Sequence, residues 1–261
     1  MDWNRVTQAI AAAEASGCTV GAGLIAPSGA RFSHRGDRRF LAASTVKLGI
    51  MIALYRRVDA GTLDLATRHI LTDADKTPGS GVILHLGAGL AFSLADLAYL
   101  MMSISDNAAT NMLIDAVGLE AVNACMRDLG MTGSVLGRKM RGRPVAPGSP
   151  ENWAVPDDFA VLMAALFNGR AASPGSCAAM QAMLEKQQND RRIARHLPRT
   201  NGPRWGSKTG SLAGVVNDVG FIITSSGPLC LAVFVENPPD PLAGEAIIGA
   251  IARAAFEAVT A

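Results

Sequence analysis

The chain has 261 residues, of which 49% are hydrophobic and 18% are charged. A chain of this length can bury a substantial core, either as one large domain or as two interleaved lobes. Its formal net charge is +2, which creates no strong field for nucleic acid or for a membrane surface. We therefore expect neither of these as a partner.

The cysteines and histidines indicate neither a metal site nor a redox site. The cysteines stand far apart, at positions 18, 125, 177 and 230, and no two of them form a C-x-x-C pair. The four histidines are also scattered along the chain. Since zinc and redox sites use clustered ligands, we expect no metal and no cofactor. The cysteines are expected to be buried free thiols.

The N-terminal residues read MDWNRVTQAIAAAEASG and contain no basic region followed by an apolar core. A secretory signal would have both. The chain as written is therefore expected in the cytoplasm, whereas a periplasmic or secreted location is expected if a signal has been removed. No apolar run reaches the ~18 residues that a membrane-spanning helix needs.

The first 60 residues alternate between helical and extended patterns. Apolar residues at positions 3, 6, 10 and 13 predict a helix over residues 2–16. The sequences CTVGAGLIA and ARFSHRG flank a turn at 27–29, which predicts a hairpin. A strongly apolar run then predicts a helix from Ser44 to Ala60, which Gly61 ends.

The middle of the chain has a helical pattern. Residues 93–130 are expected to be helical throughout, with Ser93 and Asp96 as a capping box. Residues 137–155 are rich in basic residues, prolines and glycines, which predicts a long irregular loop. Further helices are expected from Pro156 and over about 173–187.

The C-terminal part changes character. The sequences RWGSKTGSL, VVNDVGFIIT and LCLAVFVEN predict three strands, and a closing helix is expected over 241–259. The simplest assembly is an α+β fold, in which an antiparallel sheet is built from both chain ends, flanked by the terminal helices and interrupted by an all-helical insertion. We expect 1–41 and 201–261 to form an α/β lobe, 42–200 to form a helical lobe, and an active site to lie between them.

Ser44 and Lys47 stand three residues apart at the start of the apolar helix. This spacing places both side chains on one helix face. A serine hydroxyl is a weak nucleophile until a base takes its proton, and a lysine can be that base if burial or nearby cations lower its pKa. The start of a helix also favours developing negative charge. The alternative is an N-cap serine followed by a surface lysine.

Two further motifs join this pair: SDN at 105–107 and KTGS at 208–211. Taken alone, the first is explained as N-cap chemistry for a helix over 107–117, and the second as an exposed edge strand guarded by a lysine. The ordered set S-x-x-K, S-D-N and K-T-G is typical of class A β-lactamases and penicillin-binding proteins. The chain resembles this family over essentially its whole length, including the ATNMLID continuation after Asn107.

The resemblance implies a catalytic role for four residues. Ser44 attacks a carbonyl carbon and becomes acylated, and Lys47 takes its proton directly or through water. Ser105 passes a proton to the leaving nitrogen or oxygen. Lys208 supplies positive charge that lowers the pKa of Lys47 and attracts a substrate carboxylate.

The resemblance also implies how substrate is bound. Asn107 hydrogen-bonds the acyl-amide group of the substrate and helps to hold the catalytic lysine. The hydroxyls of Thr209 and Ser211 bind the carboxylate, and Gly210 lets substrate approach the strand backbone. The backbone N–H groups of Ser44 and Ser211 form an oxyanion hole.

One part of the family pattern is missing. The β-lactamases of this family deacylate with the glutamate of an Arg-x-Glu-x-x-x-Asn loop, whereas this chain has Arg138, Met140 and Pro144 at those positions. A methionine cannot take a proton from water, so we expect acylation to be followed by slow deacylation. Glu151 is the only carboxylate within 137–155. It is either a substitute base or the partner of one of the loop arginines.

Three functions stay open at this point. The first is a class A β-lactamase-like serine hydrolase acting on β-lactams or related amides and esters. The second is a cytoplasmic esterase or a peptidase that cleaves D-Ala-type bonds, which the missing signal favours. The third is a penicillin-binding or sensor module that is acylated without turnover. In each case the partner is a small β-lactam, peptide or ester, and we expect a monomer or weak dimer.

Overall fold

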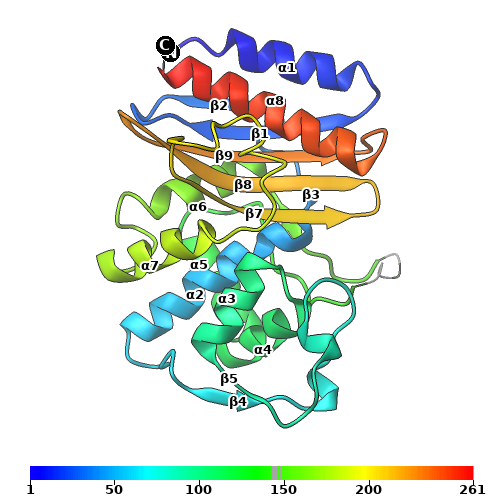
Figure 1. Cartoon of the computed structure of the whole chain (residues 1–261), viewed down its shortest axis with the longest axis vertical. Helices are drawn as coiled ribbons and strands as arrows, with labels where there is room; N and C mark the ends of the chain where they lie inside the picture. Colours follow the sequence, from blue (N-terminus) through cyan, green and yellow to red (C-terminus); the bar gives the residue numbers. More distant parts are fainter. Residues whose placement is uncertain (143–145, 147, 261) are drawn as a thin grey trace.

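A five-stranded antiparallel sheet in the order β2-β1-β9-β8-β7 lies at the centre of the fold (Figure 1). The computed structural model describes residues 1–142, 146 and 148–260. The two ends of the chain meet in this sheet, because β1 pairs with β9 and places Val20 opposite Val235. The expected hairpin and the three C-terminal strands are confirmed: β1 is Thr19–Ile25, β2 Arg31–His34, β7 Trp205–Leu212, β8 Val215–Thr224 and β9 Gly227–Glu236.

Two terminal helices cover one face of the sheet (Figure 1). They are α1 (Asn4–Glu14) and α8 (Pro241–Thr260). Apolar residues at helical spacing bury one side of α1, as the sequence predicts. The first helix is nevertheless shorter than expected, because no side chain caps its N-terminus and the chain leaves the helix after Glu14.

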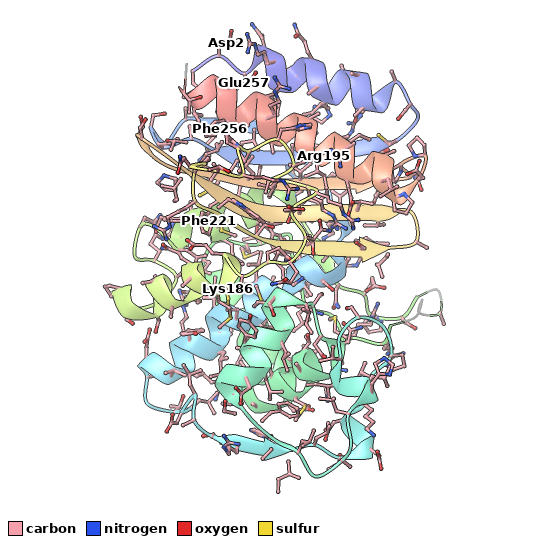
Figure 2. All side chains as sticks on the ribbon, in the orientation of Figure 1. Asp2, Lys186, Arg195, Phe221, Phe256 and Glu257 are labelled. Carbon is pink, nitrogen blue, oxygen red and sulfur yellow. The ribbon has the colours of Figure 1, made fainter. Side chains whose placement is uncertain are left out.

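The opposite face of the sheet packs on helices from the middle of the chain. Helix α6 (Pro156–Ala165) lies against β1 and β9, where Phe159 meets Phe234 edge-on at 5.9 Å between ring centroids. On the same face Phe221 meets Phe167, whereas Phe256 of α8 lies on the other side of the sheet (Figure 2). The sheet is therefore the middle layer of an α+β fold, as expected.

The remaining long helices form a helical region beside the sheet (Figure 1). They are α2 (Lys47–Asp59), α3 (Leu94–Ser103), α4 (Asn107–Val117), α5 (Leu119–Asp128) and α7 (Pro174–Leu184). Helix α2 is central, since every residue from Lys47 to Tyr55 is buried, and a helix buried on all sides belongs inside a core. Ser93 and Asp96 form the expected capping box of α3. The division into two lobes at 41/42 and 200/201 remains a prediction.

Several local features differ from the sequence-based expectation. Ser44 does not begin an α-helix: Ala43–Val46 form a 3-10 turn, and α2 begins at Lys47. Two short strand pairs were not predicted. They are β3 (Phe40–Leu41) with β6 (Trp153–Ala154), and β4 (Arg68–Ile70) with β5 (Ala91–Ser93). Strands of two or three residues are too short to show a periodic pattern, and distant partners specify them.

The cysteines are free and buried, as expected. Within the described residues, no helix has both the length and the apolar character needed to cross a membrane.

Candidate active site

A cleft of about 960 Å³ brings together residues that are far apart in the sequence. The predicted residues that line it are Ser44, Ser105, Asn107, Thr209, Ser211, Met140 and Glu151. Two predicted residues, Lys47 and Lys208, are fully buried next to these lining residues. The structure thus gathers nearly all of the sequence-predicted residues around one cavity.

Ser44 is held against the edge of the sheet. A Cβ placed on Gly210 of β7 would lie 3.1 Å from the Ser44 nitrogen and 3.0 Å from the Ala42 oxygen. A side chain at position 210 would therefore push the strand away from the serine. This close approach explains why the position holds a glycine. Asn217 of β8 also binds the segment that precedes Ser44, because its Nδ2 donates to the Leu41 oxygen at 2.8 Å.

Lys47 is buried, and its side-chain nitrogen has three hydrogen-bond acceptors. Its Nζ donates to the Ser105 carbonyl oxygen at 2.7 Å, to Ser105 Oγ at 3.1 Å and to Asn107 Oδ1 at 3.0 Å. Burial holds the pKa of Lys47 well below its ordinary value; the charge of Lys208 lowers this pKa further, and Asp106 opposes the shift. The alternative interpretation as a surface lysine is wrong, because α2 enters the core at this residue.

Ser105 has a backbone conformation that few non-glycine residues adopt, with φ +60. Hydrogen bonds hold it there: Ser80 Oγ donates to the Ser105 carbonyl oxygen at 2.7 Å, in addition to Lys47. Asp106 is the N-cap of α4, with Oδ1 accepting from the Ala109 N–H. The N-cap interpretation is therefore correct for Asp106, while its two neighbours face the cleft.

Lys208 lies on the edge strand β7 and is fully buried. The interpretation as an exposed edge guard is wrong, because the 3-10 turn at Ala43–Val46 and helix α7 cover this edge. Its Nζ donates to the Thr209 carbonyl oxygen at 2.8 Å. Burial lowers the pKa of Lys208 to about 7, Arg192 lowers it as well, and Asp218 raises it.

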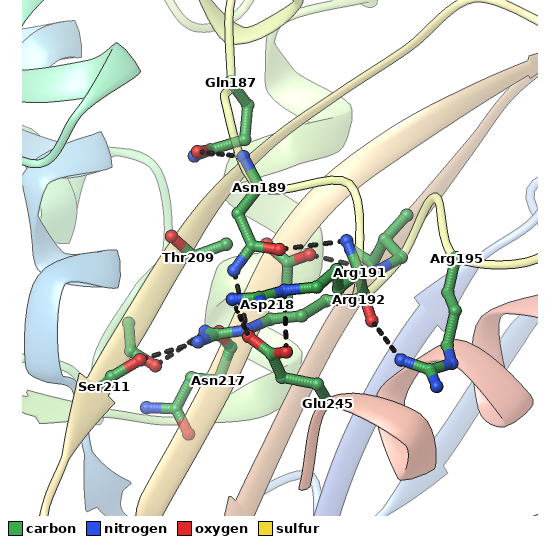
Figure 3. A network of polar contacts seen from close by, with 12 residues as sticks. Gln187, Asn189, Arg191, Arg192, Arg195, Thr209, Ser211, Asn217, Asp218 and Glu245 are labelled. Atoms are coloured by element: carbon green, nitrogen blue, oxygen red, sulfur yellow. Dashed lines mark hydrogen bonds and ion pairs between the residues drawn. The ribbon is translucent and has the colours of Figure 1, made fainter. Parts of the chain in front are cut away.

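A polar network that the sequence analysis missed supports the end of β7 (Figure 3). The buried Arg192 donates to Ser211 Oγ at 2.6 Å and to the Gly210 carbonyl oxygen at 2.9 Å. Glu245 of α8 pairs with Arg192 at 3.3 Å and with Arg191 at 3.0 Å. One available signal was the single acid in the first half of the apolar closing helix, since a buried charge usually has a partner.

The loop that carries Met140 is clamped by Asn111 of α4. Asn111 Oδ1 accepts from the Met140 N–H at 2.8 Å, and its Nδ2 donates to the Met140 carbonyl oxygen at 3.0 Å. This two-bond contact fixes the backbone of Met140, a residue that is 8% exposed, packs with the apolar core and lines the cleft. Asn111 lies in the ATNMLID segment, but the sequence alone did not assign it a role.

Glu151 also lines the cleft, and it is engaged by an arginine. Its Oε1 lies 2.8 Å from Arg138 and its Oε2 accepts from Arg138 at 2.9 Å. The Asn152 N–H donates to Oε1 at 2.7 Å. Both carboxylate oxygens of Glu151 thus have partners. This contact matches the second interpretation of Glu151, as the partner of a loop arginine. Pro144, expected at the position of the family's asparagine, lies outside the described residues.

Comparison with known proteins decides the family. A model of the beta-lactamase enzyme family matches residues 4–259, almost the whole chain. The chain belongs to the beta-lactamase enzyme family. Like its relatives, this β-lactamase family member is a serine hydrolase.

Named relatives agree with this assignment. A beta-lactamase from Sphaerobacter thermophilus has a solved structure that is 62% identical in sequence, with a TM-score of 0.96 over 99% of this chain and 98% of that chain. The carbapenem-hydrolyzing beta-lactamase KPC of Klebsiella oxytoca is 30% identical and covers 88% of this chain and 80% of its own length.

A further solved relative of this β-lactamase family member is PBP-A. It is 27% identical, with a TM-score of 0.86 over 98% of this chain and 95% of that chain. A leucine-to-glutamate variant of PBP-A was solved as an acyl-enzyme complex with penicillin G. The β-lactamase/transpeptidase-like fold expected from the sequence is thereby confirmed.

Proposed function

We propose that β-lactams, or related amides and esters, acylate Ser44 and that the acyl-enzyme is hydrolysed slowly. The observation that carries this proposal is the fully buried Lys47 side-chain nitrogen, bound to Ser105 and Asn107 beside a cleft lined by Ser44. Burial favours the neutral amine, which is the form that accepts a proton.

The acylation step follows from this arrangement. Lys47 takes the proton of Ser44, directly or through water, as the serine oxygen attacks the carbonyl carbon. The proton then passes through Ser105 Oγ, which lies 3.1 Å from Lys47 Nζ, to the leaving nitrogen or oxygen. The N–H groups of Ser44 and Ser211 stabilise the oxyanion. The close approach of Gly210 to the Ser44 nitrogen supports this role, because it brings Ser44 next to the strand that carries Ser211.

The substrate carboxylate binds at the end of β7. Ser211 Oγ accepts a hydrogen bond from Arg192, so its own hydrogen is available to donate to a carboxylate. Thr209 lines the same part of the cleft, and Lys208 adds positive charge behind it. Asn107 binds the acyl amide of the substrate. Its Oδ1 accepts from Lys47 and its Nδ2 donates to the Pro78 oxygen, and the second Nδ2 hydrogen is left to donate to the substrate.

Deacylation is slow because the described residues place no free carboxylate on the Met140 side of the cleft. The thioether of Met140 accepts no proton from water. Glu151 is held by Arg138 through both oxygens, which opposes its use as the substitute base. Hydrolysis of the acyl-enzyme then depends on poorly activated water.

Binding of a carboxylate ligand should depend on pH through Lys208. Because the pKa of Lys208 is about 7, the charged form is lost as pH rises through that value. We expect the affinity of the Ser44→Ala variant for benzylpenicillin, measured by calorimetry, to fall about tenfold between pH 6 and pH 8. A Lys208→Arg variant keeps its charge and should flatten the profile. A flat profile in the Lys208 protein would contradict this role.

The proposal is tested by comparing the protein with Ser44→Ala on a chromogenic cephalosporin and on a p-nitrophenyl ester. We expect a stoichiometric burst of cephalosporin opening followed by slow turnover, with both phases absent in the variant. Persistence of the burst in Ser44→Ala would refute Ser44 as the nucleophile.

A second function is supported by the similarity to PBP-A together with Met140. In this alternative the same site acts as a peptidase on acyl-D-Ala-type bonds or as an esterase. Rapid turnover of the ester or of an acyl-D-Ala-D-Ala peptide, without reaction with the cephalosporin, would favour it. A stable adduct with no turnover of any substrate would favour a penicillin-binding sensor.

A further inference from the structure

Arg141 is an exposed cation in the wall of the cleft, next to Met140. The backbone on both sides of it is anchored. Asn111 clamps Met140 through two hydrogen bonds. Gly142, at φ +63, packs so closely on Pro78 that a Cβ would lie 2.2 Å from the Pro78 oxygen. The arginine therefore projects from a fixed segment of the cleft wall.

The other cations that the structure describes near this wall are paired with acids. Arg138 pairs with Glu151 at 2.8 Å. Lys139 forms an ion pair with Asp115 of α4, and it is not among the residues that line the cleft.

The arginines at the opposite end of the cleft are also paired with an acid. Arg191 and Arg192 share the carboxylate of Glu245. Among the described residues, Arg141 is the cleft-lining arginine with no acidic partner. The undescribed loop residues, 143–145 and 147, are Arg, Pro, Val and Pro, so they carry no acidic side chain either.

Arg141 also lies at a different end of the cleft from the proposed carboxylate site. Its neighbour Gly142 borders Gly79, where a Cβ would lie 2.4 Å from Asn107 Nδ2. Asn107 is the residue assigned to the acyl amide, whereas Ser211 and Arg192 lie on the β7 side. With the substrate oriented as in the proposed function, its acyl side chain would lie on the Arg141 side of the cleft.

We propose that Arg141 binds an anionic group on the acyl side chain of the substrate, so that the preferred acyl donor is a dianion. One carboxylate binds at Thr209 and Ser211, and the second anionic group pairs with Arg141. The inference rests on the proposed function for the direction in which the substrate lies. It adds a specificity-determining residue and a substrate class.

Carbenicillin and benzylpenicillin provide the test, because they differ by one carboxylate on the acyl side chain. Their affinities are measured by calorimetry in a Ser44→Ala background, where no acylation interferes. We expect Arg141→Gln to lower the ratio of carbenicillin to benzylpenicillin affinity about fivefold, the effect of a partly exposed ion pair. Raised salt should reduce the ratio in the parent and leave it unchanged in Arg141→Gln. Lys139→Gln, which removes a paired cation from the same loop, should preserve the ratio.

The outcomes separate this inference from the proposed function. An equal ratio in the parent and in Arg141→Gln, or no binding of either penicillin, would overturn the inference. Intact-mass spectrometry of the Ser44-containing protein with benzylpenicillin is run in parallel. Absence of an adduct there, together with an Arg141-dependent ratio in the binding experiment, would refute acylation while supporting the anion site.

Discussion

Replacing Lys47 with methionine is expected to lower the rate of Ser44 acylation by about 100- to 10,000-fold, the usual contribution of a positioned general base. Methionine fills similar space in the buried position but removes the amine that accepts the serine proton. It also leaves Asn107 Oδ1 without its donor, and the Ser105 carbonyl oxygen with Ser80 Oγ as its remaining donor. The measurement is the second-order rate of adduct formation with benzylpenicillin, followed by intact-mass spectrometry.

Thermal unfolding shows whether the variant remains folded, since buried acceptors without a donor reduce stability. Lys76→Met provides the matched control, because Lys76 pairs with Asp73 in a 3-10 helix and does not line the cleft. A folded Lys47→Met protein that acylates at the parental rate would show that another group takes the proton.

The Met140→Glu substitution is expected to shorten the lifetime of the acyl-enzyme by about 100-fold or more, because a carboxylate is placed where the loop lines the cleft. The Asn111 clamp acts on the backbone of residue 140, so it is retained in the variant. The lifetime is measured by trapping the protein with benzylpenicillin, removing free ligand and following loss of the adduct mass.

Met140→Gln is the matched control, since glutamine has the shape of glutamate and no basic carboxylate. The two variants should acylate at similar rates and differ in deacylation alone. Equal lifetimes in the glutamate and glutamine variants would contradict the view that a missing base at this position limits turnover.

Much of the fold was predictable because long elements leave a periodic pattern. The apolar run after Lys47 and the three C-terminal strands were assigned correctly for this reason. The 3-10 turn at Ala43–Val46 was not predictable, since it depends on the positive φ of Ala43 and on contact with β7. The pairing of β3 with β6 joins segments more than 100 residues apart, and a local pattern does not specify it.

The site residues that belong to short sequence motifs were predictable. Ser44, Lys47, Ser105 and Lys208 converge around one cleft in the structure, and their catalytic roles remain predictions. Residues that act through distant contacts were missed. Arg192 and Glu245 come from separate elements, and their pairing under Ser211 follows from the packing of α8 on β8 and β9. The complete burial of Lys208 was not predicted, since it depends on the packing of the 3-10 turn and α7 against β7.

Buried polar groups explain why the cleft keeps its geometry. Asp106 and Arg192 each bind groups from more than one segment, and Lys47 joins α2 to the segment 105–107. Removing one partner from such a contact costs more than the bond itself contributes, because the remaining group stays buried and unsatisfied. Polar contacts as well as the apolar core therefore hold the residues around Ser44 in place.

The lifetime of the adduct on the unmodified protein tests the central claim most directly. The protein is mixed with benzylpenicillin, free ligand is removed, and intact-mass spectrometry with peptide mapping follows the modified fraction over time. We predict rapid, stoichiometric modification of Ser44 that persists long after ligand removal. Unmodified protein at every time point, together with β-lactam hydrolysis on the order of 10 turnovers per second or faster, would contradict the account.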